Sequence, residues 1–344
     1  MLSGYVPGSI FLTELPSTKT AEIMDGRHQT GLPSTKTRIF VDRRLKNWRL
    51  SSKTYHFEDR RAKNKKIMSK RVAIQGIKGC FHEQAAYLFY EGLGLPRPEI
   101  VECSSFEGLY RCMDSDQADA AVMAIENTVS GGLLPNFELL RKYDRKIKGE
   151  VFLRIKQNLM TLPGQKLEDL HEVRSHYMAI NQTRPYFDDY PQIRLVEYGD
   201  TAKSAADIVK TGVKGVGAIA SDLAAEIYGL EIIAEGIETS KQNFTRFLIF
   251  DDAIQVEKSR INKASMCFTL PHTPGSLAHI LTILSFYGMN LTRIQSLPIP
   301  GREWQYFFYV DIKFEDYTRY EQALSAVKPL MEDLDILGEY TAAE

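Results

Sequence analysis

Short apolar runs alternate with helix-forming stretches between residues 71 and 250, and this alternation limits the fold more than any other feature of the sequence. The runs with the composition of buried strands are residues 72–74, 99–101, 118–125, 194–198, 215–220 and 247–250. Helical patterns begin near residues 83, 105, 201 and 221. This order predicts an α/β architecture with mostly parallel strand pairing. Residues 150–162 are interpreted as a strand that crosses into a second lobe, which spans about 150–227.

Polar and glycine-rich clusters lie at the ends of these predicted strands, at residues 76–82, 126–131, 175–182, 200–204 and 243–246. In open α/β sheets, ligands bind beyond the carboxyl ends of the strands. A loop between a strand and a helix also presents backbone N–H groups to anions. We therefore expect the five clusters to converge on one substrate cleft between two lobes.

The stretch 242–250 joins one of these clusters to an apolar strand. Because side chains alternate faces along a strand, Asn243 and Thr245 are expected on one face, and Phe244 and Arg246 on the other. A hydroxyl beside a guanidinium at the mouth of an apolar strand suits an anionic small molecule. Taken alone, these residues fit an ordinary surface strand better; the other four clusters favour the binding site.

Two further positions have both a chemical and a structural interpretation. His176 follows a predicted strand and is the best-placed histidine for general acid–base work, but a helix-capping histidine fits its position equally well. Cys80 lies two residues from His82, yet a small buried thiol is the favoured interpretation over a catalytic one.

Composition excludes several classes of protein. The 344 residues have room for two or three domains, and 44% hydrophobic and 25% charged residues are ordinary for a globular protein. The net charge of −1 provides no field toward nucleic acid or a membrane surface. No apolar run approaches the ~20 residues of a membrane span. Four cysteines without a CxxC pair or zinc spacing predict free thiols in a reducing cytoplasm and no metal site.

Residues 1–70 form a basic N-terminal extension. They hold 15 basic and 6 acidic residues, a net charge of +9, and they repeat Leu-Pro-Ser-Thr-Lys-Thr at 15–20 and 32–37. They show no helical or strand periodicity and no apolar region of a secretory signal. We interpret them as a disordered extension, or as a region translated ahead of a start at Met68, in preference to a transit peptide.

The C-terminal residues 263–344 follow a charged linker at 251–262. Their pattern predicts strand, helix, two strands around the turn dipeptide Pro300-Gly301, helix and strand. The order βαββαβ is that of the ferredoxin-like split unit. Few side chains of catalytic type occur here, so the unit suits ligand sensing or dimerisation.

Several separated motifs between residues 71 and 340 resemble those of prephenate dehydratases that carry a C-terminal ACT regulatory domain. Gly-Ile-Lys-Gly-Cys-Phe-His-Glu-Gln-Ala-Ala at 76–86 resembles the family's first loop and helix, and Ile-Glu-Asn-Thr at 125–128 its Ile-Glu-Asn-Ser. Ser-His at 175–176 with Gln182 resembles its Ser-His…Gln segment, and Thr-Ala at 201–202 the start of its Ser-Thr-Ala helix. Residues 243–247, Asn-Phe-Thr-Arg-Phe, contain the Thr-Arg-Phe signature.

The resemblance implies a catalytic domain at 71–250 with two α/β lobes, similar to a type II periplasmic binding protein, and an ACT domain at 263–344. It implies the conversion of prephenate to phenylpyruvate in L-phenylalanine biosynthesis, with loss of carbon dioxide and water. A homodimer or homotetramer, L-phenylalanine as an effector and no cofactor are also implied.

The resemblance assigns roles to individual residues. Thr245 is expected to donate a hydrogen bond or a proton to the ring hydroxyl of prephenate. Arg246 is expected either to bind a carboxylate or to orient its loop, and Glu126, His176 and Gln182 to support the site. The expected substrate contacts are Lys78, Gly79, Cys80, Asn127, Thr128, Ser175, Thr201, Asn243, Arg246 and Phe247.

This sequence departs from the family pattern at several positions. Cys80 and His82 stand where hydroxyl residues are usual, so residues 78–80 are expected to contact substrate through their backbone. Asp200 replaces a frequent serine, and its charge is expected to face away from an anion site. Gln295-Ser296-Leu297-Pro298 replaces Glu-Ser-Arg-Pro at the expected effector site, which leaves the strength of phenylalanine inhibition open. The expected effector residues are Pro274, Gly275, Ser276, Leu277, Gln295, Ser296, Leu297 and Pro298.

Three rival functions remain at this point. An arogenate dehydratase differs in one substrate group, and prephenate is the favoured substrate because no convincing transit peptide is present. A non-catalytic amino-acid-sensing protein would combine a binding lobe pair with an ACT module but would not need the Thr245 hydroxyl. A periplasmic solute-binding protein is least favoured, since no signal peptide precedes Met68.

Overall fold

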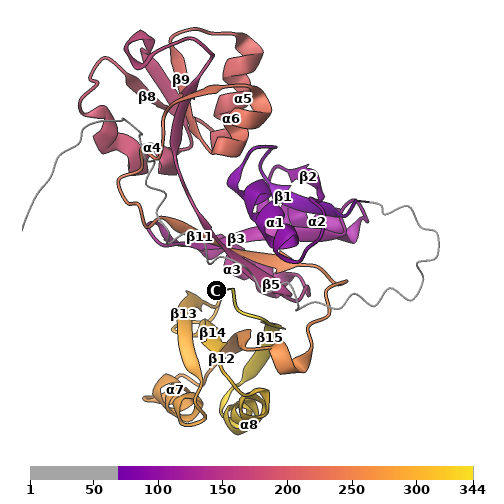
Figure 1. Ribbon diagram of the computed structural model, residues 1–344. Helices are drawn as coiled ribbons and strands as arrows, with labels where there is room; N and C mark the ends of the chain where they lie inside the picture. The colour runs from indigo at the N-terminus through magenta and orange to yellow at the C-terminus, as the bar shows by residue number, and fades with distance from the viewer. Residues whose placement is uncertain (1–68, 344) are drawn as a thin grey trace, which may run out of the picture. The chain divides into compact units, whose positions relative to one another are not determined.

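The computed structural model describes residues 69–343, which form three sheets with their helices (Figure 1). The predictions made for residues 1–68 lie outside the described residues. Among the described residues, no helix is both long enough and apolar enough to cross a membrane.

The first lobe contains a mixed sheet in the order β2-β1-β3-β11-β5, with β4 beside β3. Strands β2 and β3 are parallel to β1, whereas β11 is antiparallel to both β3 and β5. Its elements are β1 (Arg71–Gln75), α1 (Phe81–Gly92), β2 (Glu99–Cys103), α2 (Phe106–Asp114), β3 (Ala120–Asn127), β4 (Gly131–Gly132), α3 (Leu134–Lys142), β5 (Gly149–Arg154) and β11 (Phe244–Phe250).

Strand alternation gives this sheet two buried faces. Val72 and Ile74 pack in one cluster with α1, whereas Ala73 packs in another cluster with α2 and α3. In β11, Phe247 belongs to the first cluster and Leu248 to the second. Burial on both faces explains why β1, β3 and β11 are apolar along nearly their whole length.

The second lobe contains a sheet in the order β10-β6-β9-β7-β8. Residues 155–157 connect β5 of the first lobe directly to β6, so the predicted crossing strand is two strands in two sheets. The elements are β6 (Asn158–Thr161), β7 (Glu172–Ser175), α4 (Tyr177–Thr183), β8 (Arg194–Glu197), α5 (Thr201–Thr211), β9 (Val216–Ala220), α6 (Asp222–Tyr228) and β10 (Glu231–Ala234).

The prediction of mostly parallel pairing was wrong. Within residues 69–343, each lobe has two parallel pairings, β1 with β2 and β3 in the first lobe, and β7 with β8 and β9 in the second. The chain enters the second lobe through β6 and returns through β11, and these connecting strands pair antiparallel with their neighbours. Alternation of strands and helices cannot reveal such a return, because it depends on residues far apart in the sequence.

The C-terminal unit has the predicted element order βαββαβ. Its antiparallel sheet has the order β13-β14-β12-β15, and Figure 1 shows α7 and α8 side by side on one of its faces. The elements are β12 (Lys263–Thr269), α7 (Ser276–Phe286), β13 (Asn290–Pro298), β14 (Tyr306–Lys313), α8 (Tyr317–Val327) and β15 (Asp333–Tyr340).

The other face of this C-terminal sheet packs against the first lobe. Leu297 and Tyr309 share a hydrophobic cluster with Phe137 of α3. The Ile147 N–H donates to Leu337 O at 2.8 Å. A Cβ at Gly338 would collide with the Ile147 carbonyl oxygen, so the two backbones approach closely only because residue 338 is glycine.

Candidate functional site

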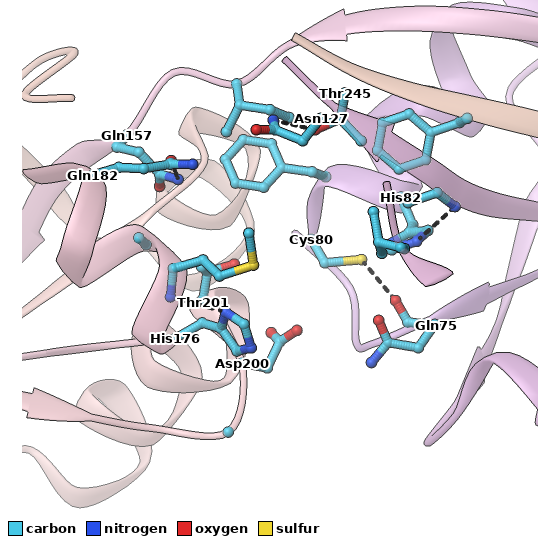
Figure 2. A pocket seen from close by; sticks show the side chains of 18 residues that line it. Gln75, Cys80, His82, Asn127, Gln157, His176, Gln182, Asp200, Thr201 and Thr245 are labelled. Atoms are coloured by element: carbon cyan, nitrogen blue, oxygen red, sulfur yellow. Dashed lines mark hydrogen bonds between the residues drawn. The ribbon is translucent and has the colours of Figure 1, made fainter. Parts of the chain in front are cut away.

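A cavity of about 190 Å³ lies between the first and second lobes (Figure 2). Lining residues from the first lobe include Cys80, Asn127 and Thr245, and those from the second include His176 and Thr201. The remaining lining residues are Gln75, Phe81, His82, Ala124, Leu133, Ile155, Gln157, Met178, Ala179, Gln182, Gly199, Asp200 and Phe247. Each of the five predicted polar clusters thus places at least one side chain on this cavity.

The amide of Asn127 is oriented by its neighbours. Its Oδ1 accepts hydrogen bonds from the backbone N–H groups of Val129 and Ser130, each at 2.9 Å. Because backbone N–H groups only donate, the Nδ2 group of Asn127 must point the other way. There it donates to Thr245 Oγ1 at 2.9 Å and to Asn243 Oδ1 at 2.7 Å.

This orientation determines what the Thr245 hydroxyl can do. Its oxygen accepts the hydrogen bond from Asn127, which is its partner on the β3–β11 ladder. A hydroxyl has one hydrogen to donate. Since Thr245 lines the cavity, that hydrogen is available to a molecule bound there. The site therefore presents a buried, aligned hydroxyl donor.

The same amide chain continues into the second lobe. Asn243 Nδ2 donates to Gln182 Oε1 at 2.9 Å, and Gln182 lies on α4. Asn243 is buried and does not line the cavity. It positions Asn127 and Gln182 rather than contacting the cavity, which corrects its predicted role as a substrate contact.

Two long helices begin at the cavity from opposite lobes. Cys80 and Asp200 are the N-cap residues of α1 and α5, and both line the cavity. The N-terminus of a helix carries partial positive charge and attracts anions. No Lys or Arg is among the described residues that line the cavity, so these helix ends and neutral donors are the groups that it offers to an anion.

The two histidines of the cavity are not placed as cationic acids. Burial lowers the pKa of His82 to about 3, and His82 Nε2 accepts a hydrogen bond from the Ala124 N–H at 3.4 Å. Burial also lowers the pKa of His176, whose Nδ1 accepts from the Met178 N–H and caps α4. The capping interpretation of His176 is thus the one that the structure shows.

Asp200 lines the cavity, contrary to the expectation that it faces away. Its Oδ1 accepts the Lys203 N–H at 3.0 Å, and it, rather than Thr201, caps α5. Its Oδ2 lies toward the first lobe, 3.3 Å from where a Cβ of Gly76 would stand. Burial raises the pKa of the Asp200 carboxyl, and the backbone N–H groups of Lys203 and Ala202 only partly oppose this shift. A capping role holds it inward despite the cost of burial.

Two predicted contacts have hydroxyls that the protein already uses. Ser175 is fully buried, and its Oγ donates to Ile219 O at 2.6 Å across the β7–β9 pair. Thr128 Oγ1 donates to Gln242 O at 2.8 Å and accepts from the Phe244 N–H at 2.9 Å. Neither residue lines the cavity, so neither is placed as a substrate contact.

The predicted contacts Lys78 and Gly79 join the two lobes instead of lining the cavity. Lys78 O accepts from Tyr228 Oη at 2.8 Å, and Gly79 O accepts from Ser221 Oγ. A Cβ at Gly79 would lie 2.8 Å from Ala224 Cα of α6. The first loop therefore packs on the second lobe, and Cys80 is its predicted residue that lines the cavity.

Arg246 points away from the cavity, so the structure does not place it as a substrate contact. Its Nε donates to Glu150 Oε2 at 2.7 Å, its Nη2 donates to Tyr340 Oη at 2.9 Å, and its Nη1 pairs with Asp311. The side chain is 3% exposed. Strand alternation placed it opposite Thr245 as predicted, and the alternative role of orienting its segment agrees with these contacts.

The side chain of Glu126 also points away from the cavity and toward the C-terminal sheet. Its Oε2 lies 2.5 Å from Arg293 Nη1 of β13, and the carboxylate does not line the cavity. These contacts are compatible with the supporting role predicted for Glu126, which stays a prediction.

Several lining residues were not predicted. Gln157 and Ile155 lie in the connection between the lobes, and Met178 lies on α4. A polar glutamine inside the predicted apolar crossing segment 150–162 was a signal for Gln157. The apolar residues offered none, because only their tertiary neighbours distinguish cavity walls from core.

The predicted effector residues lie at the start of α7 and the end of β13. Gly275 has φ +84° and is the N-cap of α7, and Ser276 and Leu277 begin that helix. Leu297 is buried in the cluster with Phe137, and Gln295 Oε1 lies 3.7 Å from a Cβ built at Gly132. The Leu297 side chain is therefore covered by the first lobe, and Gln295 is half-buried beside it; Pro274, Ser296 and Pro298 are exposed.

The sequence is similar to that of known proteins over more than three quarters of the chain. A family model described as prephenate dehydratase matches residues 72–254, more than half of the chain. A bifunctional chorismate mutase/prephenate dehydratase of Aquifex aeolicus is 31% identical over 275 residues, which cover 79% of this chain and 74% of the relative. An Arabidopsis thaliana protein described as arogenate dehydratase/prephenate dehydratase 2, chloroplastic, is 34% identical, and the match covers 78% of this chain and 72% of the relative.

Solved structures share the fold across most of the chain. The prephenate dehydratase of Arthrobacter aurescens in complex with L-Phe has a TM-score of 0.70 and 27% identity, with 79% of this chain and 89% of that one covered. A protein described as a novel type of quorum quenching acylase has a TM-score of 0.71 and 27% identity, with coverage of 80% and 98%. These two structures carry different descriptions, so the shared fold alone does not identify the reaction.

Proposed function

The chain belongs to the prephenate dehydratase family and is a carbon–oxygen lyase of phenylalanine biosynthesis, and on this premise we propose that it converts prephenate to phenylpyruvate in the cavity between its lobes. The observation that carries the proposal is the Thr245 hydroxyl. Asn127 fixes its oxygen as an acceptor, so its hydrogen is directed to the bound molecule.

In this reaction the departing hydroxyl develops negative charge, which the site has to stabilise. The bond from the ring to its carboxylate breaks and releases carbon dioxide, and the electron pair moves through the ring as the hydroxyl leaves from the opposite carbon. The ring becomes aromatic, and the hydroxide takes up one proton to become water. Thr245 donates to that oxygen as negative charge develops there. A threonine hydroxyl is a poor acid, so its proton passes late, when the C–O bond is nearly broken, and the threonine regains a proton from solvent water when the products leave.

The two carboxylates of prephenate are matched by the helix ends. The N-termini of α1 and α5 open on the cavity, with Cys80 and Thr201 lining it. Gln182 and Gln157 supply neutral amides. We assign substrate contact to Cys80, Asn127, Thr201 and Phe247, because these are the predicted contacts that line the cavity.

We further propose that the C-terminal unit is an ACT domain that binds phenylalanine through the 274–277 segment with Ser296 and Pro298. The related prephenate dehydratase of Arthrobacter aurescens is described as a complex with L-Phe, which supports phenylalanine as the ligand. The protein is proposed to act as a homodimer or homotetramer in the cytoplasm, where its four free cysteines would stay reduced.

Arogenate is the second candidate substrate, and two cavity groups favour it. Arogenate carries an ammonium group where prephenate carries a keto group. The Asp200 carboxylate lines the cavity, and Gln157 Oε1 is buried without a hydrogen-bond donor among residues 69–343. Both groups are acceptors suited to an ammonium. Two Arabidopsis relatives named arogenate dehydratase/prephenate dehydratase support the same alternative.

Turnover of both compounds by the full chain tests the proposal. Prephenate is followed by the appearance of phenylpyruvate, and arogenate by the appearance of phenylalanine. We expect kcat/KM to be higher for prephenate. Turnover of arogenate alone would change the substrate, and turnover of neither compound would favour the amino-acid-sensing protein.

Asp200→Asn is expected to increase the preference for prephenate. The amide side chain would keep an acceptor for the Lys203 N–H but remove a negative charge that attracts ammonium and repels carboxylates. The ratio of kcat/KM for prephenate to that for arogenate should rise about tenfold, which corresponds to about 1.4 kcal/mol. Because burial raises the pKa of Asp200, the wild-type carboxyl takes up a proton as pH falls, and the wild-type ratio should approach that of the variant. Asp207→Asn, on the same helix but away from the cavity, is the control; equal ratios in both variants would contradict the role of Asp200.

A further inference from the structure

Two neighbouring residue pairs of the β3–β11 ladder face opposite ways. Thr245 pairs with Asn127, and the next pair is Arg246 with Glu126. The first pair lines the cavity. The second pair points to the sheet of the C-terminal unit, where each of its members forms an ion pair. The C-terminal unit therefore contacts the ladder one residue away from the reacting hydroxyl.

Arg246 is bound to two strands of the C-terminal sheet. Its guanidinium pairs with Asp311 of β14 and donates to Tyr340 Oη of β15 at 2.9 Å. Asp311 is 7% exposed, and Ser265 Oγ donates to its other oxygen. Burial alone would raise the pKa of Asp311, but the Arg246 charge lowers it, so the carboxylate stays ionised. Both side chains are buried, so bulk solvent screens this pair little.

Glu126 is bound by a third strand of the same sheet. Arg293 of β13 reaches it at 2.5 Å and lies over the Phe137 ring, 4.3 Å from the ring centroid. Gly132 pairs with Glu126 on the β3–β4 ladder, and a Cβ there would lie 2.7 Å from Arg293 Nη2. A methyl group at residue 132 would therefore require the guanidinium to shift.

The ladder itself is weakened beside this pair. The register of β11 and β3 shifts between Arg246 and Phe247, where two β3 steps oppose one β11 step. A bulge interrupts the backbone hydrogen bonds at that point. The side-chain ion pairs consequently contribute more to the geometry here than they would beside a regular ladder.

We propose that Asp311 and Arg293 are positioning residues, through which the C-terminal unit sets the geometry of the Thr245–Asn127 pair. They act through the adjacent Arg246–Glu126 pair and do not touch substrate. The inference rests on the proposed function, because it is the Thr245 hydroxyl that must be aligned with the leaving group. A misplacement of about 1 Å at a reacting group can cost ~100-fold in rate.

Asp311→Asn is the direct test. It removes the charge that pairs with Arg246, and we expect kcat for prephenate to fall roughly 10- to 100-fold, with KM changed less than about twofold. Asp335→Asn is the matched control. Asp335 of β15 also joins the C-terminal unit to the first lobe, through Lys146 at 3.0 Å, but this pair is half exposed and does not involve β3 or β11. Its kcat should stay within about twofold of wild type.

Gly132→Ala carries the test if Asp311→Asn does not fold. The added methyl group displaces Arg293 from Glu126 without changing any charge, and kcat should again fall with little change in KM. A double-mutant comparison separates positioning from general damage. In the Thr245→Val background no aligned hydroxyl remains, so Asp311→Asn should lower the residual turnover less than about twofold.

Each outcome bears on a different claim. Equal kcat for Asp311→Asn and Asp335→Asn, or an undiminished effect of Asp311→Asn in the Thr245→Val background, would overturn the inference alone. Wild-type protein that turns over neither prephenate nor arogenate would overturn the proposed function and this inference with it.

Discussion

Thr245→Val lowers kcat for prephenate at least ~100-fold in our expectation, the size of effect found when a group that serves the transition state is removed. Valine has nearly the shape of threonine, so the cavity and its apolar contacts stay the same. What is lost is the hydrogen that Asn127 directs into the cavity by donating to the threonine oxygen. Because the loss concerns the departing hydroxyl, KM should change only a few-fold. Phenylpyruvate formation at saturating prephenate measures the effect.

Thr245→Ser is the control for this prediction. Serine keeps the hydroxyl that accepts from Asn127 and donates to the substrate, and it loses only a methyl group. It should retain at least about a tenth of wild-type kcat. A valine variant as active as the serine variant would show that the reaction does not use the Thr245 hydroxyl and would overturn its assigned role.

Arg246→Met should cause the largest loss of stability, about 3–5 kcal/mol in the free energy of unfolding. The guanidinium is 3% exposed and lies between Glu150 and Asp311. Lys263 remains beside Glu150, at 2.8 Å, but Asp311 would be left as a buried carboxylate without its main partner. Urea denaturation at pH 7, followed by far-UV circular dichroism, measures the loss.

The pH dependence of this loss has a definite sign. In the wild type, Arg246 overcomes burial and holds the pKa of Asp311 below its usual range, so this pair contributes stability that disappears as pH falls. In the variant, burial acts on Asp311 with less opposition, and the carboxyl takes up a proton more readily. The difference in unfolding free energy between the two proteins should therefore be larger at pH 7 than at pH 5.

Arg97→Met is the matched control for the arginine. Arg97 pairs with Glu91 at 2.5 Å, but the two side chains are 57% and 48% exposed. Exposed ion pairs contribute little to stability, so this variant should unfold at nearly the wild-type urea concentration. Comparable losses for the two variants would show that burial of the Arg246 pair has no special role.

Local pattern predicted much of the architecture. The alternation of apolar runs and helices predicted two α/β lobes, and the order βαββαβ at the C-terminus was confirmed. The polar clusters at strand ends supply most of the polar side chains of the cavity. These features depend on periodicity and on turn residues within about ten positions, which a sequence displays directly.

The predictions failed where a residue far away in the sequence determines the role of a side chain. Ser175 and Thr128 have the side chains of substrate contacts, yet Ile219 and Gln242 already occupy their hydroxyls. Asp200 was expected to face away because its charge is unfavourable near an anion, but its role as the cap of α5 holds it at the cavity. The identity of a polar side chain does not reveal whether its hydrogen-bond partner will be another part of the protein or a ligand.

Thr245 and Arg246 show most clearly which features the local sequence determines and which depend on tertiary packing. The sequence by itself determined that they lie on opposite faces of one strand, because side chains alternate in an extended backbone. Only the tertiary structure decided which face became the cavity and which met Asp311, 65 positions along the chain. Alternation is a property of the local backbone, whereas the environment of each face depends on which distant segments pack against it.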